Sequence, residues 1–264
     1  MMVVKAGGRA LESNMEGILR SISRRAGRGL VFVHGGGDIV TRFEEALGVE
    51  PRFVVSPQGI RSRLTTKEEM EVFNMVMSGK LNKEIVAGLH RLGVGAVGLS
   101  GVDGGLMRAQ RKKRIVIVDE RGRRRAIEGG YTGSIKEVNT KLIETLTGMG
   151  YIVVVAPVAL GYEGELLNVD ADQAASAIAS ALKADQLVIL TDVEGVLVDG
   201  ELVKEIRVGE VDKLGGKIGV GMNRKVLMCA RSVEAGVSRA VIASGLVDDP
   251  LENVEKGAGT IITR

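Results

Sequence analysis

The feature that most constrains the fold is an apolar run that ends in three consecutive glycines. Residues 30–33 are apolar, His34 follows, and Gly35, Gly36 and Gly37 come directly before an amphipathic pattern. This order is typical of a buried strand, a tight turn and a helix that begins on the glycines. Glycine lets a backbone approach a bound anion, and a helix N-terminus offers unpaired N–H groups. By itself, the turn fits either tight packing or a phosphate site.

A second turn of the same kind stands at the start of the chain. Residues 3–5 form a short apolar strand with Lys5 at its end, Gly7 and Gly8 follow, and apolar residues at helical spacing continue to Ile22. Two similar turns in one chain favour a site built from both, since each would bring backbone N–H groups and a helix N-terminus.

The rest of the chain continues to alternate between strands and helices. Residues 66–91 are predicted to form a long helix, and the fully apolar run 151–157 is typical of the centre of a parallel sheet. Further strands are predicted at 96–99, 186–192, 239–243 and 259–262. Further helices are predicted at 135–147, in an alanine-rich stretch that ends at 182, and in a stretch that begins near 222. A polar turn is predicted at 59–65, and glycine-rich loops are predicted at 215–217 and 219–225. The pattern predicts a single α/β domain over residues 1–264, a three-layer α/β/α sandwich whose two lobes share one continuous, mostly parallel sheet.

A strongly basic segment interrupts this pattern between residues 108 and 125. It holds nine Lys or Arg residues against two acidic ones, whereas the whole chain carries only +3. An apolar run, a turn and a second run within the segment predict a protruding hairpin. Such a charge run is either a solvated face or a surface for an acidic partner.

Several classes of protein are disfavoured. No apolar run reaches the roughly 18 residues of a membrane span, and a single cysteine, Cys229, fits a reducing cytoplasm. With only two histidines, a zinc site rich in thiolate or imidazole is not expected, and no metal ligands are assigned to the chain. The P-loop, the dinucleotide fingerprint and the nucleophile elbow of hydrolases are all missing.

The polar residues that remain suit phosphoryl transfer. Lys5 and Lys225 stand beside glycines, and Asp172 lies at a predicted helix start. In phosphoryl transfer the protein mainly positions groups and neutralises charge. A carboxylate acceptor suits this set, because it is ionised at neutral pH and needs no general base.

Six motifs in order resemble the amino acid kinase family, and most closely its acetylglutamate kinase group. They are K-x-G-G at Lys5, HGGG at His34, G-x-R-x-R-L-T at Gly59, N-x-D-A-D-Q-A-A at Asn168, T-D-V-x-G-V at Thr191 and G-M-x-x-K-V at Gly221. The sequence from Gly130 to Asn139 is similar to the branch whose substrates are amino acids carried on LysW, a small acidic carrier protein of lysine and sometimes arginine biosynthesis. The resemblance implies the amino acid kinase fold, with an acceptor-binding and dimerisation lobe over about residues 1–155 and a nucleotide-binding lobe over about 156–264.

The resemblance also implies roles for matched positions. Lys5 and Lys225 would stabilise the transition state, and Asp172 would hold both ammonium groups. The implied substrate-binding residues are Gly36, Gly37, Arg63 and Asn168, with Arg63 as the clamp for the side-chain carboxylate. The implied nucleotide-binding residues are Gly7, Gly8, Thr191, Asp192 and Gly221, with ATP as donor and Mg²⁺ bridging its phosphates. Arg61 departs from the single arginine of the acetylglutamate pattern, so either arginine remains a candidate for the clamp.

The basic segment is the expected docking surface for the carrier. Its candidate contact residues are Arg111, Lys112, Lys113, Arg114, Arg123 and Arg124. The sequence thus predicts a cytoplasmic kinase, dimeric through helix 66–91, that phosphorylates 2-aminoadipate, glutamate or both on LysW. The alternatives are a kinase of free N-acetylglutamate, a catalytically silent nucleotide-binding regulator and a nucleic-acid binder. The intact lysines and Asp172 oppose the silent regulator, and an aromatic content of 3% opposes base stacking.

Overall fold

The computed structural model describes residues 1–214 and 216–264. One large sheet takes its strands from both halves of the chain, from β1 near the N-terminus to β17 near the C-terminus. Among these residues the sheet has eleven strands, with β11 and β5 pairing with β10 beside the main path. In spatial order the main path is β15 (Glu205–Arg207), β17 (Thr260–Thr263), β16 (Arg239–Ser244), β12 (Gln186–Thr191), β1 (Met2–Ala6), β2 (Leu30–His34), β10 (Ile152–Gly161), β6 (Met107–Arg111) and β9 (Gly133–Val138), and the side strands are β11 (Leu166–Asn168) and β5 (Ala96–Gly101). Most neighbours are parallel, whereas β6–β9, β10–β11 and β16–β17 are antiparallel. The predicted continuous, mostly parallel sheet is confirmed.

Helices cover both faces of the sheet. The helices are α1 (Gly8–Ser23), α2 (Gly37–Ala46), α3 (Lys67–Asn74), α4 (Asn82–Arg91), α5 (Thr140–Gly148), α6 (Ala171–Leu182), α7 (Val220–Glu234) and α8 (Pro250–Glu255), with a π-helix at Met75–Leu81 and 3₁₀ turns at Asp103–Gly105 and Val208–Leu214. Alternate residues of a strand point to opposite faces. Val4 and Phe32 therefore pack with α1, α4 and α8, whereas Val3 and Val33 pack with α5, α6 and α7. This arrangement is the predicted three-layer sandwich.

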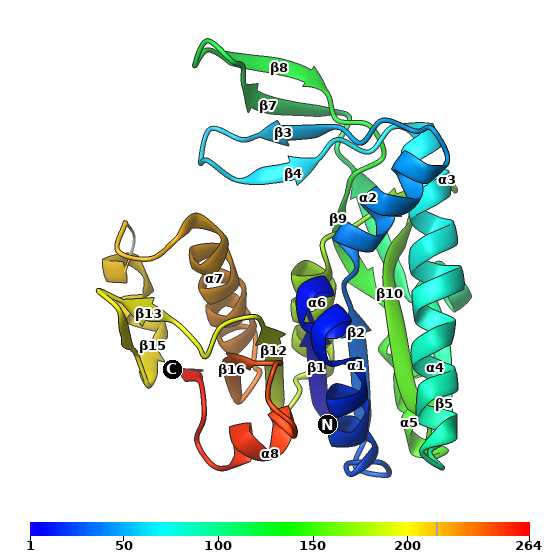
Figure 1. Cartoon of the computed structure of the whole chain (residues 1–264), viewed down its shortest axis with the longest axis vertical. Helices are drawn as coiled ribbons and strands as arrows, with labels where there is room; N and C mark the ends of the chain where they lie inside the picture. The colour runs from blue at the N-terminus through cyan, green and yellow to red at the C-terminus, as the bar shows by residue number, and fades with distance from the viewer. Residues whose placement is uncertain (215) are drawn as a thin grey trace.

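Two hairpins project from the same end of the sheet (Figure 1). One joins β3 (Phe53–Val55) to β4 (Arg61–Arg63), and the other joins β7 (Arg114–Val118) to β8 (Arg124–Glu128). Strand β3 contacts β7, so the hairpins lie against each other. The basic hairpin predicted from the charge run is confirmed. A third, smaller hairpin joins β13 (Leu197–Val198) and β14 (Glu201–Leu202).

Two secondary-structure predictions before residue 150 are wrong. The polar turn predicted over 59–65 instead contains strand β4 at residues 61–63, because their backbone groups pair with β3. The helix predicted over 135–147 is instead strand β9 followed by α5. Strand β9 completes the sheet edge against β6, and Asn139 caps the later helix by accepting a hydrogen bond from Leu142 N.

The long helix predicted over residues 66–91 is confirmed as one helical run from Lys67 to Arg91, with π geometry between Met75 and Leu81. A capping box between Thr66 and Glu69 starts it. The π turn packs against the glycine turn, since a Cβ on Gly36 would lie 2.3 Å from Leu81 Cδ1. Among the described residues, no helix is long and apolar enough to cross a membrane. The predicted loop at 215–217 includes Gly215, which lies outside the described residues.

Candidate active site

An open cavity of about 690 Å³ lies where the starts of several helices meet. Gly8 of α1 and Gly37 of α2 line it, and α7 contributes Arg224 and Lys225 from its first turns. Helices α1, α2 and α7 all begin without a side-chain cap. Their first N–H groups are therefore free of side-chain acceptors, and the positive ends of their dipoles favour an anion in the cavity.

The two predicted catalytic lysines meet on one carboxylate. Lys5 Nζ lies 2.7 Å from Asp172 Oδ1, and Lys225 Nζ lies 2.5 Å from Asp172 Oδ2. The side chains of Lys5 and Asp172 are 7% and 8% exposed. Burial alone would raise the pKa of Asp172, but the two ammonium groups outweigh it and hold this pKa well below its usual range. One fixed carboxylate thus positions two cations, which leaves one net positive charge at the cavity wall.

The two glycine turns pack directly against each other. A Cβ on Gly8 would lie 3.2 Å from Gly36 N, and a Cβ on Gly35 would lie 3.0 Å from Gly8 N. Because both strands β1 and β2 end here in parallel register, their turns meet at the same edge of the sheet. The close approach requires residues without side chains and forms a cradle of backbone N–H groups next to Lys5.

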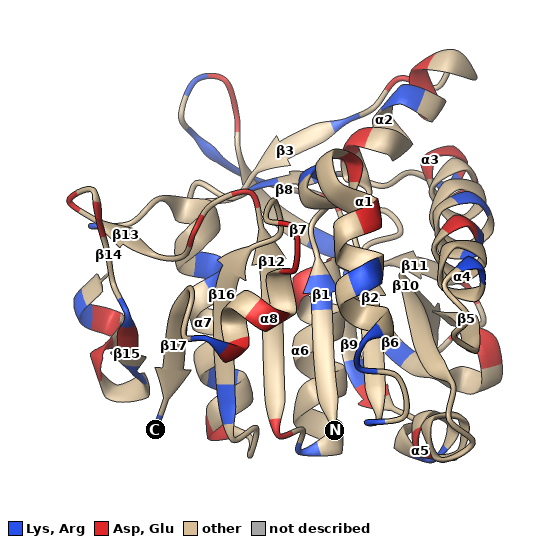
Figure 2. Cartoon of the chain, turned by 60° about the horizontal axis from the view of Figure 1, so that its bottom comes forward, with Lys and Arg blue, Asp and Glu red and all other residues tan. Residues whose placement is uncertain are grey.

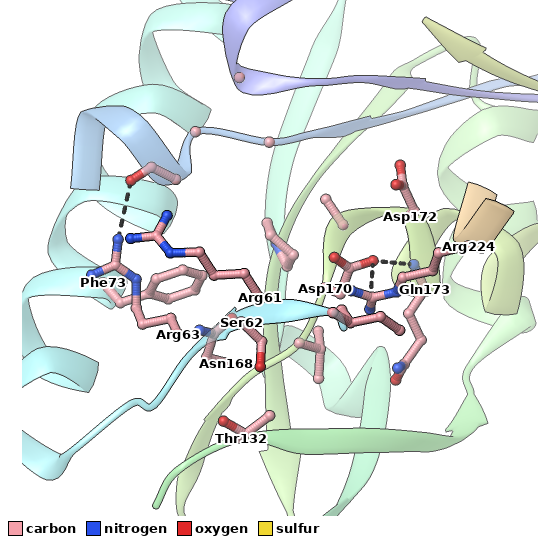
Figure 3. Close-up of a pocket in the computed structure, with 18 of the residues that line it drawn as sticks. Arg61, Ser62, Arg63, Phe73, Thr132, Asn168, Asp170, Asp172, Gln173 and Arg224 are labelled. Carbon is pink, nitrogen blue, oxygen red and sulfur yellow. Dashed lines mark hydrogen bonds and ion pairs between the residues drawn. The ribbon is translucent and has the colours of Figure 1, made fainter. Parts of the chain in front are cut away.

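The predicted acceptor-binding residues line the other side of the cavity. Figure 3 shows Arg61, Arg63 and Asn168 together, across the cavity from Asp172 and Arg224. Asn168 Nδ2 donates to Thr65 Oγ1 at 2.9 Å, which orients its amide. The structure therefore brings the implied acceptor side and the lysine cluster to opposite walls of one cavity.

Four residues assigned to the nucleotide do not line this cavity. Gly7 caps α1 and donates its N–H to Leu190 O at 3.1 Å, and Gly221 lies in the first turn of α7. Thr191 ends β12, and Asp192 follows it and pairs with Arg9 at 3.4 Å. Gly7 and Gly221 stand within three residues of cavity-lining residues in the chain, whereas Thr191 and Asp192 lie at the end of β12, which pairs with β1. The contact of all four with nucleotide stays a prediction.

The basic hairpin joins the cavity at its root. Lys112 lines the cavity, and its N–H donates to Thr132 O at 2.9 Å. Partial burial lowers the pKa of Lys112, the nearby Arg224 lowers it further, and Asp170 opposes both. Arg111 lies beside the cavity, with Nε donating to Gly130 O at 2.7 Å.

The other predicted carrier contacts lie further along the hairpin, outside the cavity. Lys113, Arg114, Arg123 and Arg124 are exposed, and the ribbon in Figure 2 is blue where Lys and Arg residues occur along this hairpin. Lys113 pairs with Glu163 at 2.7 Å.

Sequence reasoning missed three charged residues at this site. Arg224 Nη2 lies 3.4 Å from Asp170 Oδ1, and both residues line the cavity. Asp170 also caps α6 by accepting from Gln173 N, a role that an aspartate just before an alanine-rich helix could have suggested. Glu44, fully buried, pairs with Arg63, and nothing in its sequence context indicated that contact.

The described part of the chain contains no group of three or more His, Cys, Asp or Glu residues able to hold a metal ion. Cys229 is buried, and burial raises the pKa of its thiol, so it is not a nucleophile.

A family model named amino acid kinase family matches residues 1–244. Among full-length relatives, a [LysW]-aminoadipate/[LysW]-glutamate kinase of Sulfolobus acidocaldarius is 49% identical over 263 residues, covering 99% of this chain and 100% of the relative. A protein of the same name from Saccharolobus solfataricus is 51% identical, covering 99% of both chains.

Solved structures agree with this likeness. A Streptococcus mutans protein superposes with a TM-score of 0.79 at 28% identity, covering 99% of this chain and 98% of the other. An N-acetylglutamate synthase of Neisseria gonorrhoeae, solved with coenzyme A and N-acetyl-glutamate, gives a TM-score of 0.82 at 25% identity, covering all of this chain and 59% of the other.

Proposed function

Because the chain belongs to the amino acid kinase family, we propose that it transfers a phosphoryl group from ATP to the side-chain carboxylate of an amino acid carried on LysW. Two relatives that match this chain over its full length, at 49% and 51% sequence identity, carry the name [LysW]-aminoadipate/[LysW]-glutamate kinase. The acceptor is therefore carrier-linked 2-aminoadipate, glutamate or both.

The cavity residues suit this transfer. An oxygen of the acceptor carboxylate forms a bond to the γ-phosphorus of ATP, the bond from that phosphorus to the ADP oxygen breaks, and ADP leaves with the electron pair. No proton moves, because the carboxylate is already ionised at neutral pH. Lys5 and Lys225, fixed by Asp172, face the charge that spreads over the phosphoryl oxygens. The glycine turns add N–H donors without side chains in the way.

ATP is the donor expected of this family, and the cradle fits its phosphates. The uncapped starts of α1, α2 and α7 and the two lysines supply N–H groups and positive charge for an anion. Since the described residues offer no cluster of metal ligands, Mg²⁺ would be held chiefly by the nucleotide phosphates. Its charge would then neutralise the phosphates beside Lys5 and Lys225.

The observation that carries the carrier proposal is the continuity between the basic hairpin and the acceptor cavity. Lys112 lines the same cavity as Asp172 and Asn168, while Arg114, Arg121 and Arg124 extend outward along the hairpin. A free amino acid in the cavity does not reach the hairpin tip. An acidic carrier does, because its linked amino acid enters the cavity while its body lies on the cations. Complementary charge then raises the rate of association.

A charge-reversal variant tests this docking. Arg114, Arg121 and Arg124 are exposed and have no ion pair among the described residues, so replacing all three with Glu should leave the fold intact. We expect kcat/KM for the carrier-linked acceptor to fall at least about tenfold at low salt and its salt dependence to flatten. KM for ATP should stay within about twofold of the wild-type value, because ATP is not expected to contact the hairpin.

The matched control makes the same change of charge elsewhere. Arg28, Arg207 and Arg231 are also exposed, and their joint replacement by Glu should leave kcat/KM for the carrier-linked acceptor near the wild-type value. If the hairpin variant performs like this control at low salt, the hairpin is a solvated face and does not dock the carrier.

A further inference from the structure

Helix α1 is kinked at Asn14. The backbone of Asn14 has φ −148° and ψ 42°, outside the helical range, although the residues on both sides continue the helix. A helix kinks where a side chain disturbs its ladder of backbone hydrogen bonds, and asparagine is a poor residue for a helix interior. The kink coincides with a side chain whose hydrogen bonds lie outside the helix.

The Asn14 side chain joins α1 to the loop that follows β16, residues 245–249. Its Nδ2 donates to Gly245 O at 2.9 Å and to Val247 O at 2.7 Å, so both N–H groups of the amide have an acceptor in this loop. Within α1, a Cβ on Gly17 would lie 2.4 Å from Asn14 Oδ1. The amide therefore rests over a glycine that leaves room for it, and it links two segments that are far apart in the chain.

The same loop is tied to the end of β12. Gly245 N donates to Thr191 O at 2.7 Å. A Cβ on Gly245 would lie 2.9 Å from Ala10 Cβ and 3.3 Å from Leu190 Cβ, so the loop packs tightly on both α1 and β12. The first part of α1, the end of β12 and the loop after β16 thus form one connected block, in which Asn14 supplies the link at the kink.

This block lies on the side of the cavity toward which the nucleotide of the proposed reaction would extend. In phosphoryl transfer the attacking and leaving oxygens lie roughly in line with the phosphorus. The acceptor side carries Asn168 on β11, which pairs with β10, and the phosphate cradle stands at the ends of β1 and β2. Strands β12 and β16 continue the sheet from β1 on the side away from β10 (Figure 1). The leaving ADP would therefore extend over the carboxyl ends of β12 and β16, where parallel sheets commonly bind ligands.

We infer that Asn14 is a positioning residue for the nucleotide, because it holds the loop after β16 and the end of β12 in register with the phosphate cradle at the start of α1. This inference rests on the proposed function, in which ATP is the donor. Asn14 does not line the cavity, so it acts through Gly245 and Thr191 rather than by touching ATP. Loss of its two hydrogen bonds would loosen the nucleotide side and leave the acceptor wall unchanged.

Two replacements test the amide. Asn14→Asp keeps the shape of the side chain but has no N–H donors, and Asn14→Ala removes the amide and favours a straight helix. We expect each to raise KM for ATP about tenfold, as for the loss of two hydrogen bonds, and to leave KM for the carrier-linked acceptor within about twofold of the wild-type value. Ser13→Ala, at the exposed neighbouring position, is the control and should change neither KM.

A merely structural contact gives a different result. The melting temperature of both Asn14 variants would then fall while KM for ATP of the folded enzyme stayed at the wild-type value, and this outcome would overturn the inference. An equal rise in KM for ATP and for the carrier-linked acceptor would also overturn it, since the effect would not be confined to the nucleotide side.

A double-mutant cycle with Gly17 tests whether the effect passes through Asn14. Alanine favours a helix more than glycine does, so Gly17→Ala should not weaken α1 itself. Its Cβ would meet the Asn14 amide, however. We expect Gly17→Ala to raise KM for ATP about threefold or more in the wild-type background and to have no effect in the Asn14→Ala background. An equal effect in the two backgrounds would contradict the inference.

Failure of the proposed function would be recognised separately, because the wild type would then form no acyl phosphate from carrier-linked 2-aminoadipate or glutamate. The role of Asn14 is in that case tested by calorimetry with ATP and with ADP. Weaker nucleotide binding by Asn14→Asp and Asn14→Ala than by the wild type and Ser13→Ala supports it. Equal affinities, or no binding by the wild type, contradict it.

Discussion

At the scale of single residues, the chemistry depends on the two lysines that share Asp172. A buried carboxylate holds the two ammonium groups in position, so they need little reorganisation when charge develops on the phosphoryl group. The roles of all three residues could be predicted from the sequence, because each residue lies in a short motif. The roles of Glu44 and Arg224 could not be predicted, because they depend on contacts between segments far apart in the chain.

Removing either lysine should therefore affect catalysis rather than folding. We expect Lys5→Ala and Lys225→Ala each to lower kcat by about 10²-fold or more, as for the loss of one electrostatic stabiliser. Hydroxamate formation from the acyl phosphate measures the rate, and circular dichroism checks the fold. The exposed Lys204→Ala is the control. Near-native turnover in either variant would remove that lysine from the catalytic set.

His34 gives a prediction about pH and stability. Its ring is fully buried in β2, and burial lowers the pKa of His34 from 6.5 to about 4, although a hydrogen bond to Gly35 O opposes this. Between these values the unfolded chain binds a proton at this position and the folded chain does not. Stability is therefore complete above pH 6.5 and falls as the pH drops toward 4.

The size of this effect is on the order of 3 kcal/mol, since one pKa unit corresponds to about 1.4 kcal/mol. The measurement compares urea unfolding of wild type and His34→Gln between pH 7 and pH 4. The variant should lose less stability on acidification, because only the wild type carries this group, while carboxylates and the exposed His90 are common to both. Parallel curves for the two proteins would show that His34 does not contribute.

At the scale of elements, the two hairpins shape the acceptor side of the cavity. The basic hairpin could be predicted because turn and charge pattern are local signals. The β3–β4 hairpin and strand β9 could not be predicted, because their sequences lack a strict alternation of apolar and polar residues. Pairing with other segments of the chain decides their structure. The π turn within the long helix could not be predicted either, since it reflects packing of Leu81 against Gly36.

The root of the basic hairpin should control the acceptor site through Gly130. This residue has φ +61°, and a Cβ would lie 2.2 Å from Thr65 O, next to the hydroxyl that orients Asn168. Gly130→Ala should lower the melting temperature and raise the acceptor KM more than the ATP KM, because strain of about 1–3 kcal/mol would displace Thr65.

Gly122→Ala is the matched control for this prediction. Gly122 also has a positive φ, +74°, but it lies at the hairpin tip, where a Cβ would meet no atom within 4 Å. This replacement should leave the acceptor KM unchanged. Equal acceptor KM values for the two variants would mean that Gly130 does not couple the hairpin to the cavity.

At the scale of the whole molecule, the continuous sheet places the acceptor wall and the lysine cluster at one edge. Strands β1, β2 and β12 are parallel neighbours, so the segments that follow them converge there although they are far apart in sequence. Composition and motif order were enough to predict this architecture, since the alternation of strands and helices leaves few topologies. The division into acceptor and nucleotide lobes, and the homodimer expected from the long helix, remain predictions.

The central claim is that the acceptor is an amino acid on a carrier protein. The most direct measurement is kcat/KM of the wild-type enzyme, by ADP release and hydroxamate formation, for LysW-linked 2-aminoadipate, LysW-linked glutamate and free N-acetylglutamate. The account predicts at least about 100-fold higher kcat/KM for a carrier-linked acceptor at low salt, because only that acceptor engages the basic hairpin. An equal or higher kcat/KM for free N-acetylglutamate would contradict the account and identify a kinase of the free acetylated amino acid.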